Sequence, residues 1–160
     1  MKNLILFLLF TLNCFAQKTI QEVLVKYNKN LVPYISVNEL KEKQNIILFD
    51  SRDATEYKVS HLKNANYVGF DDFDSKKIKE KFTNPNATII VYCSIGVRSE
   101  IIGKKLLKMG YKNVFNLYGG IFEWSNHNLP VYDSDDKQTQ NVHAFSKEWS
   151  QYLKKGNKVY

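Results

Sequence analysis

Short apolar runs alternate with amphipathic segments through the middle of the chain. Two of these runs, Ile46 to Phe49 and Thr88 to Tyr92, are continuous and rich in β-branched residues. This pattern is typical of strands that are buried on both faces of a parallel sheet. Val114 to Leu117 and the segment around Tyr67 and Val68 are weaker strand candidates. The pattern therefore predicts a largely buried sheet.

Helical signals lie between the predicted strands. Ser36 and Glu39 form a capping box that opens a short helix. Ser75 to Phe82 reads as a charged helix, and Ser99 to Met109 carries apolar residues at helical spacing until Gly110 stops it. Strands that alternate with helices predict an α/β fold, with a central, mainly parallel sheet flanked by helices.

The end of the chain has a different character. Residues 133–138 are polar and read as a connector. Beyond them, apolar residues recur at steps of three and four positions, which predicts an amphipathic C-terminal helix that docks on the domain, with a partner-binding helix as the alternative. These apolar residues are Val142, Phe145, Trp149 and Tyr152 or Leu153. We therefore divide the chain into an N-terminal extension at 17–35, a main domain at 36–132, and a connector with a helix at 133–160.

The first residues predict export. One lysine is followed by an almost wholly apolar run, Leu4 to Leu12, and then by small and polar residues, which is the order found in secretory signal peptides. The run is much shorter than the roughly 20 residues that span a bilayer. We expect cleavage after Ala16, so that residues 1–16 are a signal peptide and the protein is periplasmic or secreted. The alternative is a lipoprotein that is held at the membrane through acylated Cys14.

Composition and charge narrow the class of protein. The 160 residues are 44% hydrophobic, which suits one packed domain and excludes an intrinsically disordered chain. Two cysteines exclude a disulfide-stapled scaffold, and removal of Cys14 with the signal would leave Cys93 as the sole thiol. The net charge of +7 is spread along the chain among acidic residues, without a recognisable nucleic-acid-binding module. We expect no nucleic-acid partner.

The segment most informative about chemistry lies between a predicted strand and a predicted helix. Cys93 directly follows the strand, and Arg98 comes five positions later. The carboxyl end of a parallel strand is where ligands bind in α/β sheets, and the next helix directs its free N–H groups to that point. The helix N-terminus and Arg98 both favour the thiolate, the reactive form of cysteine. Cys93 is therefore a candidate nucleophile.

A glycine within the loop strengthens this interpretation. Gly96 allows backbone angles that other residues resist, so that several N–H groups can converge on one anion. The ordinary alternative is a small buried cysteine at a strand end, which is a common fate of a lone cysteine. The combination of cysteine, internal glycine, arginine and helix favours a functional loop.

The chain resembles the rhodanese-like sulfurtransferases in three motifs that occur in the family's order. The loop from Cys93 to Ser99 is similar to the family's active-site ring. An upstream motif resembles the amino-terminal signature, except that Ser60 stands where the pattern usually has glycine, and a downstream motif resembles the carboxy-terminal signature. The upstream residues are Asp50-Ser51-Arg52, Glu56-Tyr57, His61-Leu62 and Ala65-Asn66, and the downstream ones are Gly110-Tyr111, Val114, Leu117, Gly119-Gly120-Ile121 and Trp124. The likeness covers about Ser36 to Val131.

This resemblance implies a two-step sulfur transfer. Cys93 would take sulfane sulfur from an anionic donor such as thiosulfate, hold it as a persulfide, and pass it to a thiol or cyanide. The donor or acceptor could also be another protein. The ring residues would bind the substrate, their backbone N–H groups stabilising the persulfide and Arg98 orienting the donor. These ring residues are Ser94, Ile95, Gly96, Val97, Arg98 and Ser99.

Two alternative functions remain open at this point. A rhodanese-like module could carry or bind sulfur without efficient turnover of its own. A cysteine-based phosphatase or arsenate reductase is the other class, although the related tyrosine phosphatases place five residues between cysteine and arginine, and this chain has only four. A shorter ring fits a single sulfur better than a tetrahedral phosphate.

Other polar and glycine residues have supporting interpretations. Asp50, Arg52 and Glu56 are spaced for turn hydrogen bonds and an ion pair that brace the site from behind. Gly119 and Gly120 are expected to allow a close backbone approach near the loop from Cys93 to Ser99, which is called the catalytic loop below. The three histidines show no ligand spacing, so neither a metal site nor a cofactor is expected.

Overall fold

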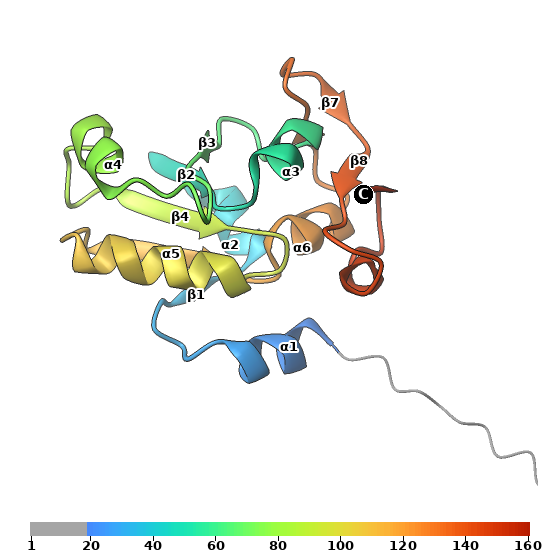
Figure 1. Cartoon of the computed structure of the whole chain (residues 1–160), viewed down its shortest axis with the longest axis horizontal. Helices are drawn as coiled ribbons and strands as arrows, with labels where there is room; N and C mark the ends of the chain where they lie inside the picture. The colour runs from blue at the N-terminus through green and yellow to red at the C-terminus, as the bar shows by residue number, and fades with distance from the viewer. Residues whose placement is uncertain (1–18) are drawn as a thin grey trace, which may run out of the picture.

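A five-stranded, wholly parallel sheet forms the centre of the protein, with the strand order β1-β5-β4-β2-β3 (Figure 1). The computed structural model describes residues 19–160. The predicted signal peptide at 1–16 and Cys14 lie outside the described residues. The strands are β1 (Tyr34–Ile35), β2 (Ile46–Asp50), β3 (Asn66–Tyr67), β4 (Thr88–Tyr92) and β5 (Asn113–Leu117). All four strands predicted from the sequence are present, and β1 is an addition.

Helices cover both faces of this sheet. They are α1 (Ile20–Tyr27), α2 (Val37–Glu42), α3 (Ala54–Val59), α4 (Ser75–Lys81), α5 (Val97–Lys108) and α6 (Gly120–Asn126). The predicted α/β fold is thus confirmed. Within the described residues, no helix is both long enough and apolar enough to cross a membrane.

The central strand β4 shows how the core is divided. Ile90 and Tyr92 belong to the cluster that includes α2 and α6, whereas Ile89 and Val91 belong to the cluster that includes α4 and α5. All four side chains are fully buried. Successive side chains of a strand point to opposite faces, so a strand covered on both sides is apolar at nearly every position. This arrangement explains the unbroken apolar run.

The N-terminal extension is packed into the domain. It supplies α1 and the edge strand β1, which pairs with β5. Leu24 is buried, and the backbone N–H of Lys29 donates a hydrogen bond of 2.7 Å to the Glu100 carboxylate on α5. The capping box at Thr19 and Glu22 fixes the start of α1. The extension is therefore packed against β5 and α5.

The C-terminal segment differs from the sequence prediction. The predicted amphipathic helix at its end is wrong: two short parallel strands, β8 (Asn141–His143) and β9 (Asn157–Val159), flank a single 3₁₀ turn at Trp149–Tyr152. The backbone N–H of Ala144 pairs with Val159, and Phe145 has a left-handed φ of 64°, so a helix cannot run through this region. Val142, Tyr152 and Leu153 are buried because β8 and the end of the 3₁₀ segment pack onto the domain, whereas Phe145 is exposed.

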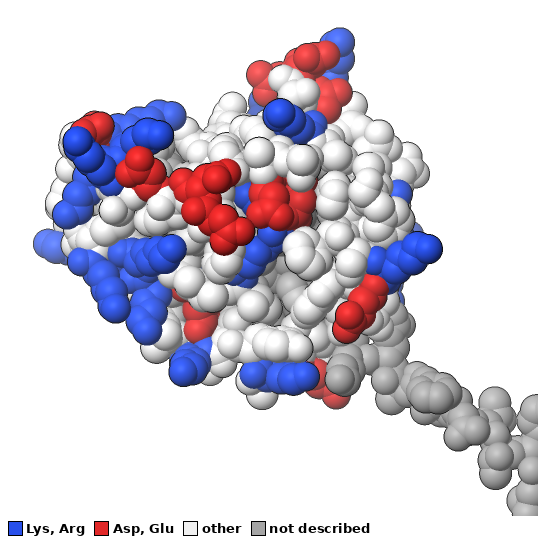
Figure 2. All heavy atoms as spheres, viewed as in Figure 1, with Lys and Arg blue, Asp and Glu red and all other residues white. Residues whose placement is uncertain are grey.

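The predicted polar connector is a hairpin. Strand β6 (Val131–Tyr132) pairs antiparallel with β7 (Gln138–Thr139), and Asp133 joins Lys137 by a backbone hydrogen bond. The tip of this hairpin is exposed and charged (Figure 2). The hairpin therefore leads the chain to β8, which lies next to α3.

Candidate active site

Cys93 lies at the carboxyl end of β4, where the loop to α5 begins. Its side chain is buried, and its Sγ accepts a hydrogen bond of 3.1 Å from the backbone N–H of Gly96. The Ser99 hydroxyl lies 3.5 Å from the same sulfur. Helix α5 begins at Val97, so its N-terminus and its positive dipole end face this sulfur. The loop therefore surrounds the thiol with hydrogen-bond donors.

The electrostatic surroundings favour the charged form of this thiol. Burial opposes the thiolate and by itself raises the pKa of Cys93. The positive charge of Arg98 and hydrogen bonds from Ser99 and Gly96 act in the opposite direction, and they hold the pKa of Cys93 below its ordinary value. A thiolate is the nucleophilic form of cysteine, so the site is poised for attack on an electrophilic atom.

Arg98 is held in a network of carboxylates. Its guanidinium forms two hydrogen bonds to the Glu56 carboxylate, of 2.6 and 2.9 Å, and one of 3.0 Å to the Ser94 hydroxyl. Asp53 lies 3.5 Å from the same guanidinium. Burial disfavours ionised Glu56, but the hydrogen bonds and charge of Arg98 outweigh it and lower the pKa of Glu56. Glu56 thus joins the catalytic loop directly.

A second ion pair lies behind the loop. Arg52 and Asp50 are fully buried and form a salt bridge of 2.6 Å. Arg52 also donates a hydrogen bond to the carbonyl oxygen of Ser60. Ser60 has a φ of −170°, which is extended backbone open to any residue, so the serine needs no glycine conformation here. The three predicted supporting residues therefore belong to two ion pairs. Asp50 and Arg52 pair with each other, whereas Glu56 pairs with Arg98 of the loop.

Asn116 is a site residue that the sequence analysis did not identify. It lies fully buried on β5, where its side-chain amide donates to the carbonyl of Gly96 and its oxygen accepts from the Ser99 hydroxyl. From the other side, Asn28 also donates a hydrogen bond to the Gly96 carbonyl. A polar residue in the otherwise apolar end of a predicted strand was the signal that could have revealed Asn116.

Gly120 allows α6 to approach the catalytic loop, as predicted. A Cβ atom at this position would overlap the carbonyl oxygen of Cys93, and its φ is 54°. The backbone N–H groups of Ile121 and Phe122 donate to the carbonyls of Cys93 and Ser94, at 2.9 and 3.1 Å. The first turn of α6 therefore holds the start of the loop in place.

A cavity of about 210 Å³ opens over the loop. On one side it is lined by Cys93, Ser94, Ile95, Val97 and Arg98. On the other side it is lined by three aromatic residues that the sequence analysis did not assign to the site, namely Tyr27, Phe145 and Trp149. In Figure 1, α1 lies below the β4–α5 loop, and the C-terminal segment lies to its right.

The expected absence of a metal site is not contradicted by the described residues. Between residues 19 and 160, no group of three or more histidine, cysteine, aspartate or glutamate side chains could hold a metal ion. His61 instead stacks on Tyr57, with ring centroids 4.1 Å apart. Cys93 and the hydrogen-bond donors around it remain the reactive groups that the loop presents.

Comparisons with known proteins agree with this arrangement. The family model for the rhodanese-like domain matches residues 36–127. The thiosulfate sulfurtransferase GlpE of Coxiella burnetii strain RSA 331 / Henzerling II is 29% identical over 107 residues, which cover 65% of this chain and 94% of GlpE.

Solved structures show the same fold. A rhodanese-like domain from Anabaena sp. superposes with a TM-score of 0.57 at 20% identity, over 63% of this chain and 79% of that one. A thiosulfate sulfurtransferase from Pseudomonas aeruginosa gives 0.58 at 20% identity, over 76% of this chain and 23% of that one. The family match ends before Phe145 and begins after Tyr27, so the aromatic side of the cavity lies outside it.

Proposed function

The chain belongs to the rhodanese-like domain family, and on that premise we propose that it is a sulfurtransferase that carries sulfane sulfur as a persulfide on Cys93. The donor is an anion such as thiosulfate, and the acceptor is a thiol or cyanide. The observation that carries the proposal is the position of the Cys93 sulfur, which faces the N-terminus of α5 and receives the Gly96 N–H. The similarity to GlpE supports the same class of reaction.

Each step of this reaction conserves atoms and charge. The Cys93 thiolate attacks the outer sulfur of thiosulfate, the sulfur–sulfur bond of the donor breaks, and sulfite leaves with the bonding electron pair. An acceptor thiolate or cyanide then attacks the outer sulfur of the persulfide, and Cys93 leaves as a thiolate. The backbone N–H of Gly96 and the N-terminus of α5 stabilise negative charge on the sulfur in both steps.

A phosphatase is less well supported. The related tyrosine phosphatases place five residues between cysteine and arginine, whereas only four lie between Cys93 and Arg98. The cavity above the loop is lined largely by aromatic and aliphatic residues. The shorter loop suits a single sulfur atom better than a bound phosphate.

The proposal is tested by mass and by turnover. The purified protein is incubated with thiosulfate, its intact mass is measured, and thiocyanate is followed after cyanide is added. We expect the addition of one sulfur atom to the wild type and steady thiocyanate formation, and neither result for Cys93→Ser, which preserves the size of the side chain. Sulfur addition without turnover would identify a carrier module. Equal turnover by Cys93→Ser, or faster hydrolysis of an aryl phosphate, would contradict the proposal.

We propose that the reaction takes place outside the cytoplasm. Within residues 1–16, a lysine is followed by an apolar run and then by small and polar residues, an order that is typical of a signal peptide. The protein is recovered from the exported fraction of a bacterial host, and its N-terminus is determined by mass spectrometry. A chain that begins at Gln17 supports cleavage after Ala16, whereas a lipid-modified chain that begins at Cys14 supports the lipoprotein. An uncut chain in the cytoplasm would contradict export.

A further inference from the structure

The cavity over Cys93 is lined in part by aromatic residues from two segments near the ends of the chain. Tyr27 lies at the end of α1, and Phe145 and Trp149 belong to the C-terminal segment. The rings of Tyr27 and Trp149 contact each other, with centroids 6.2 Å apart. We call these three residues the aromatic wall. They bring two segments that are far apart in sequence to the mouth of one cavity.

Two members of the aromatic wall are exposed to an unusual degree. Tyr27 is 51% exposed and Phe145 is 47% exposed. Large apolar side chains gathered at a cavity mouth are typical of a binding surface. Phe145 is also held in the left-handed backbone region, which is unfavourable for a bulky residue, by a hydrogen bond from its N–H to the ring of His143. A costly conformation that presents an aromatic ring next to the reactive loop points to a role for that ring.

Nearby carboxylates balance much of the positive charge at the cavity. The guanidinium of Arg98 is shared between Glu56 and Asp53, and the ring of Phe145 lies over it at 4.9 Å. On the same face, acidic side chains gather between α4 and α3 (Figure 2). Most of the cavity lining beyond Ser94 and Arg98 is apolar, so this surface can distinguish acceptors by their apolar groups.

We propose that the aromatic wall binds the apolar group of an organic thiol, and that this thiol is the acceptor of the sulfur carried by Cys93. The inference deepens the proposed function and rests on it. An apolar cavity of about 150 Å³ can hold benzene, so the 210 Å³ here has room for a ring or a short alkyl chain together with its sulfur. The acceptor thiolate attacks the outer sulfur of the persulfide, the sulfur–sulfur bond to Cys93 breaks, and an organic persulfide leaves.

The test compares two thiols of similar acidity, benzyl mercaptan and 2-mercaptoethanol. The protein is first loaded with thiosulfate, the excess donor is removed, and the rate of return to the unmodified mass is measured against thiol concentration. The ratio of the two rates is divided by the ratio measured with glutathione persulfide in solution, which removes the difference in intrinsic reactivity. We expect a corrected preference of about tenfold or more for benzyl mercaptan, a discrimination typical of hydrophobic pockets.

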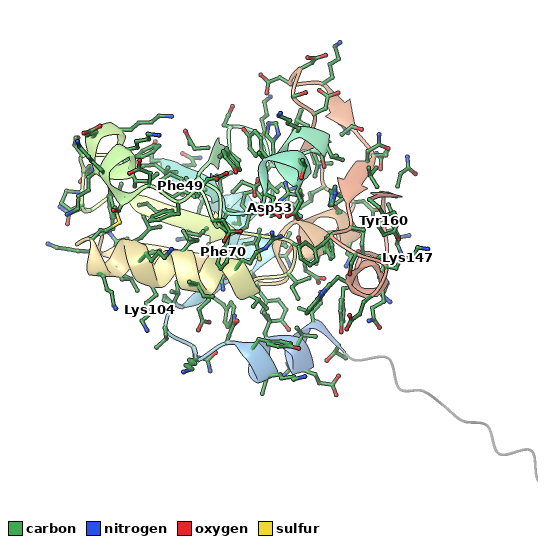
Figure 3. All side chains as sticks on the ribbon, viewed as in Figure 1. Phe49, Asp53, Phe70, Lys104, Lys147 and Tyr160 are labelled. Carbon is green, nitrogen blue, oxygen red and sulfur yellow. The ribbon has the colours of Figure 1, made fainter. Side chains whose placement is uncertain are left out.

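Variants locate the preference on the aromatic wall. Phe145→Ala and Trp149→Ala are each expected to lower the corrected preference several-fold, and Trp149→Phe, which preserves an aromatic ring, is expected to retain most of it. Tyr160→Ala is the matched control, because Tyr160 is 60% exposed and lies at the outer edge of the C-terminal segment, outside the cavity lining (Figure 3). Thermal unfolding of each variant verifies that it is folded.

The outcomes separate this inference from the proposed function. If thiosulfate adds no sulfur to Cys93, the proposed function fails, and the inference fails with it. If the persulfide forms and cyanide discharges it, but the corrected preference is absent, only the inference is overturned. A preference that persists unchanged in both alanine variants overturns the assignment to the aromatic wall.

Discussion

The guanidinium of Arg98 serves both the fold and the thiol. It is paired with Glu56 and hydrogen-bonded to Ser94, so it fixes α3 to the catalytic loop. Its positive charge also acts on Cys93, where it is the largest influence that lowers the thiol pKa against the cost of burial. Removal of this side chain would leave the buried Glu56 carboxylate without its partner, which adds negative charge near the sulfur.

Arg98→Met is therefore expected to raise the pKa of Cys93. Only the thiolate is alkylated rapidly, and a higher pKa leaves less of it at neutral pH, so alkylation by iodoacetamide should slow by about tenfold or more at neutral pH. The rate measured against pH should move to higher pH in the variant. Lys104→Met is the control, because it removes one positive charge from the exposed side of the same helix (Figure 3). Unchanged profiles for Arg98→Met, or equal shifts in both variants, would contradict this account.

At the residue scale, the sequence predicts site residues that are close together in the chain better than site residues that are far apart in it. Cys93, Gly96 and Arg98 lie within one loop between a strand and a helix, so their proximity follows from their spacing. Asn116 reaches the same loop only because β5 pairs with β4 in the parallel sheet. No spacing rule connects it to Gly96 or Ser99, and the sequence pattern therefore missed it.

The contact between α6 and the catalytic loop depends on the absence of a side chain at Gly120. Gly120→Ala would combine left-handed backbone strain with overlap against the Cys93 carbonyl. We expect a loss of about 3 kcal/mol in the free energy of unfolding, together with slower sulfur transfer.

Gly110→Ala provides the matched control for this prediction. Gly110 also has a positive φ, of 101°, but nothing lies within 4 Å of its added Cβ. This variant is expected to lose only the 1–2 kcal/mol or so that left-handed backbone costs. Both variants are compared by urea denaturation and by thiocyanate formation. Equal losses in the two variants would show that backbone strain alone, and no close approach, explains the glycine at 120.

At the element scale, most of the architecture follows from the hydrophobic pattern. The runs at 46–49 and 88–92 lie in β2 and β4, because strands that are covered on both faces are mostly apolar along their length. The C-terminal pattern wrongly predicted a helix, because apolar residues at steps of three and four positions also occur where a strand and a 3₁₀ turn follow each other along the chain. The backbone angle at Phe145, which breaks the helix, has no signal in its side-chain type.

The whole molecule is larger than the part that matches the family model. Helix α1 packs through Leu24, whose side chain would lie 3.3 Å from a Cβ placed on Gly96. Leu24→Ala is expected to cost about 3 kcal/mol of unfolding free energy, because it removes a buried side chain next to the catalytic loop.

Its neighbour Val25 provides the control, because this side chain is 74% exposed on the same helix. Val25→Ala should change the unfolding free energy by less than about 0.5 kcal/mol. Urea denaturation followed by tryptophan fluorescence measures both variants. A negligible loss for Leu24→Ala would mean that α1 is not packed against the domain in solution.

The origin of the aromatic wall also separates two properties of the protein along its sequence. The nucleophile and its hydrogen-bond donors are encoded between residues 93 and 99, whereas the surface that faces them is encoded near residues 27, 145 and 149. On the proposed acceptor assignment, mutations near the two ends of the chain would change which thiols are accepted and would leave the reacting groups intact. The residues that react and the residues that select the acceptor would then lie on separate stretches of the sequence.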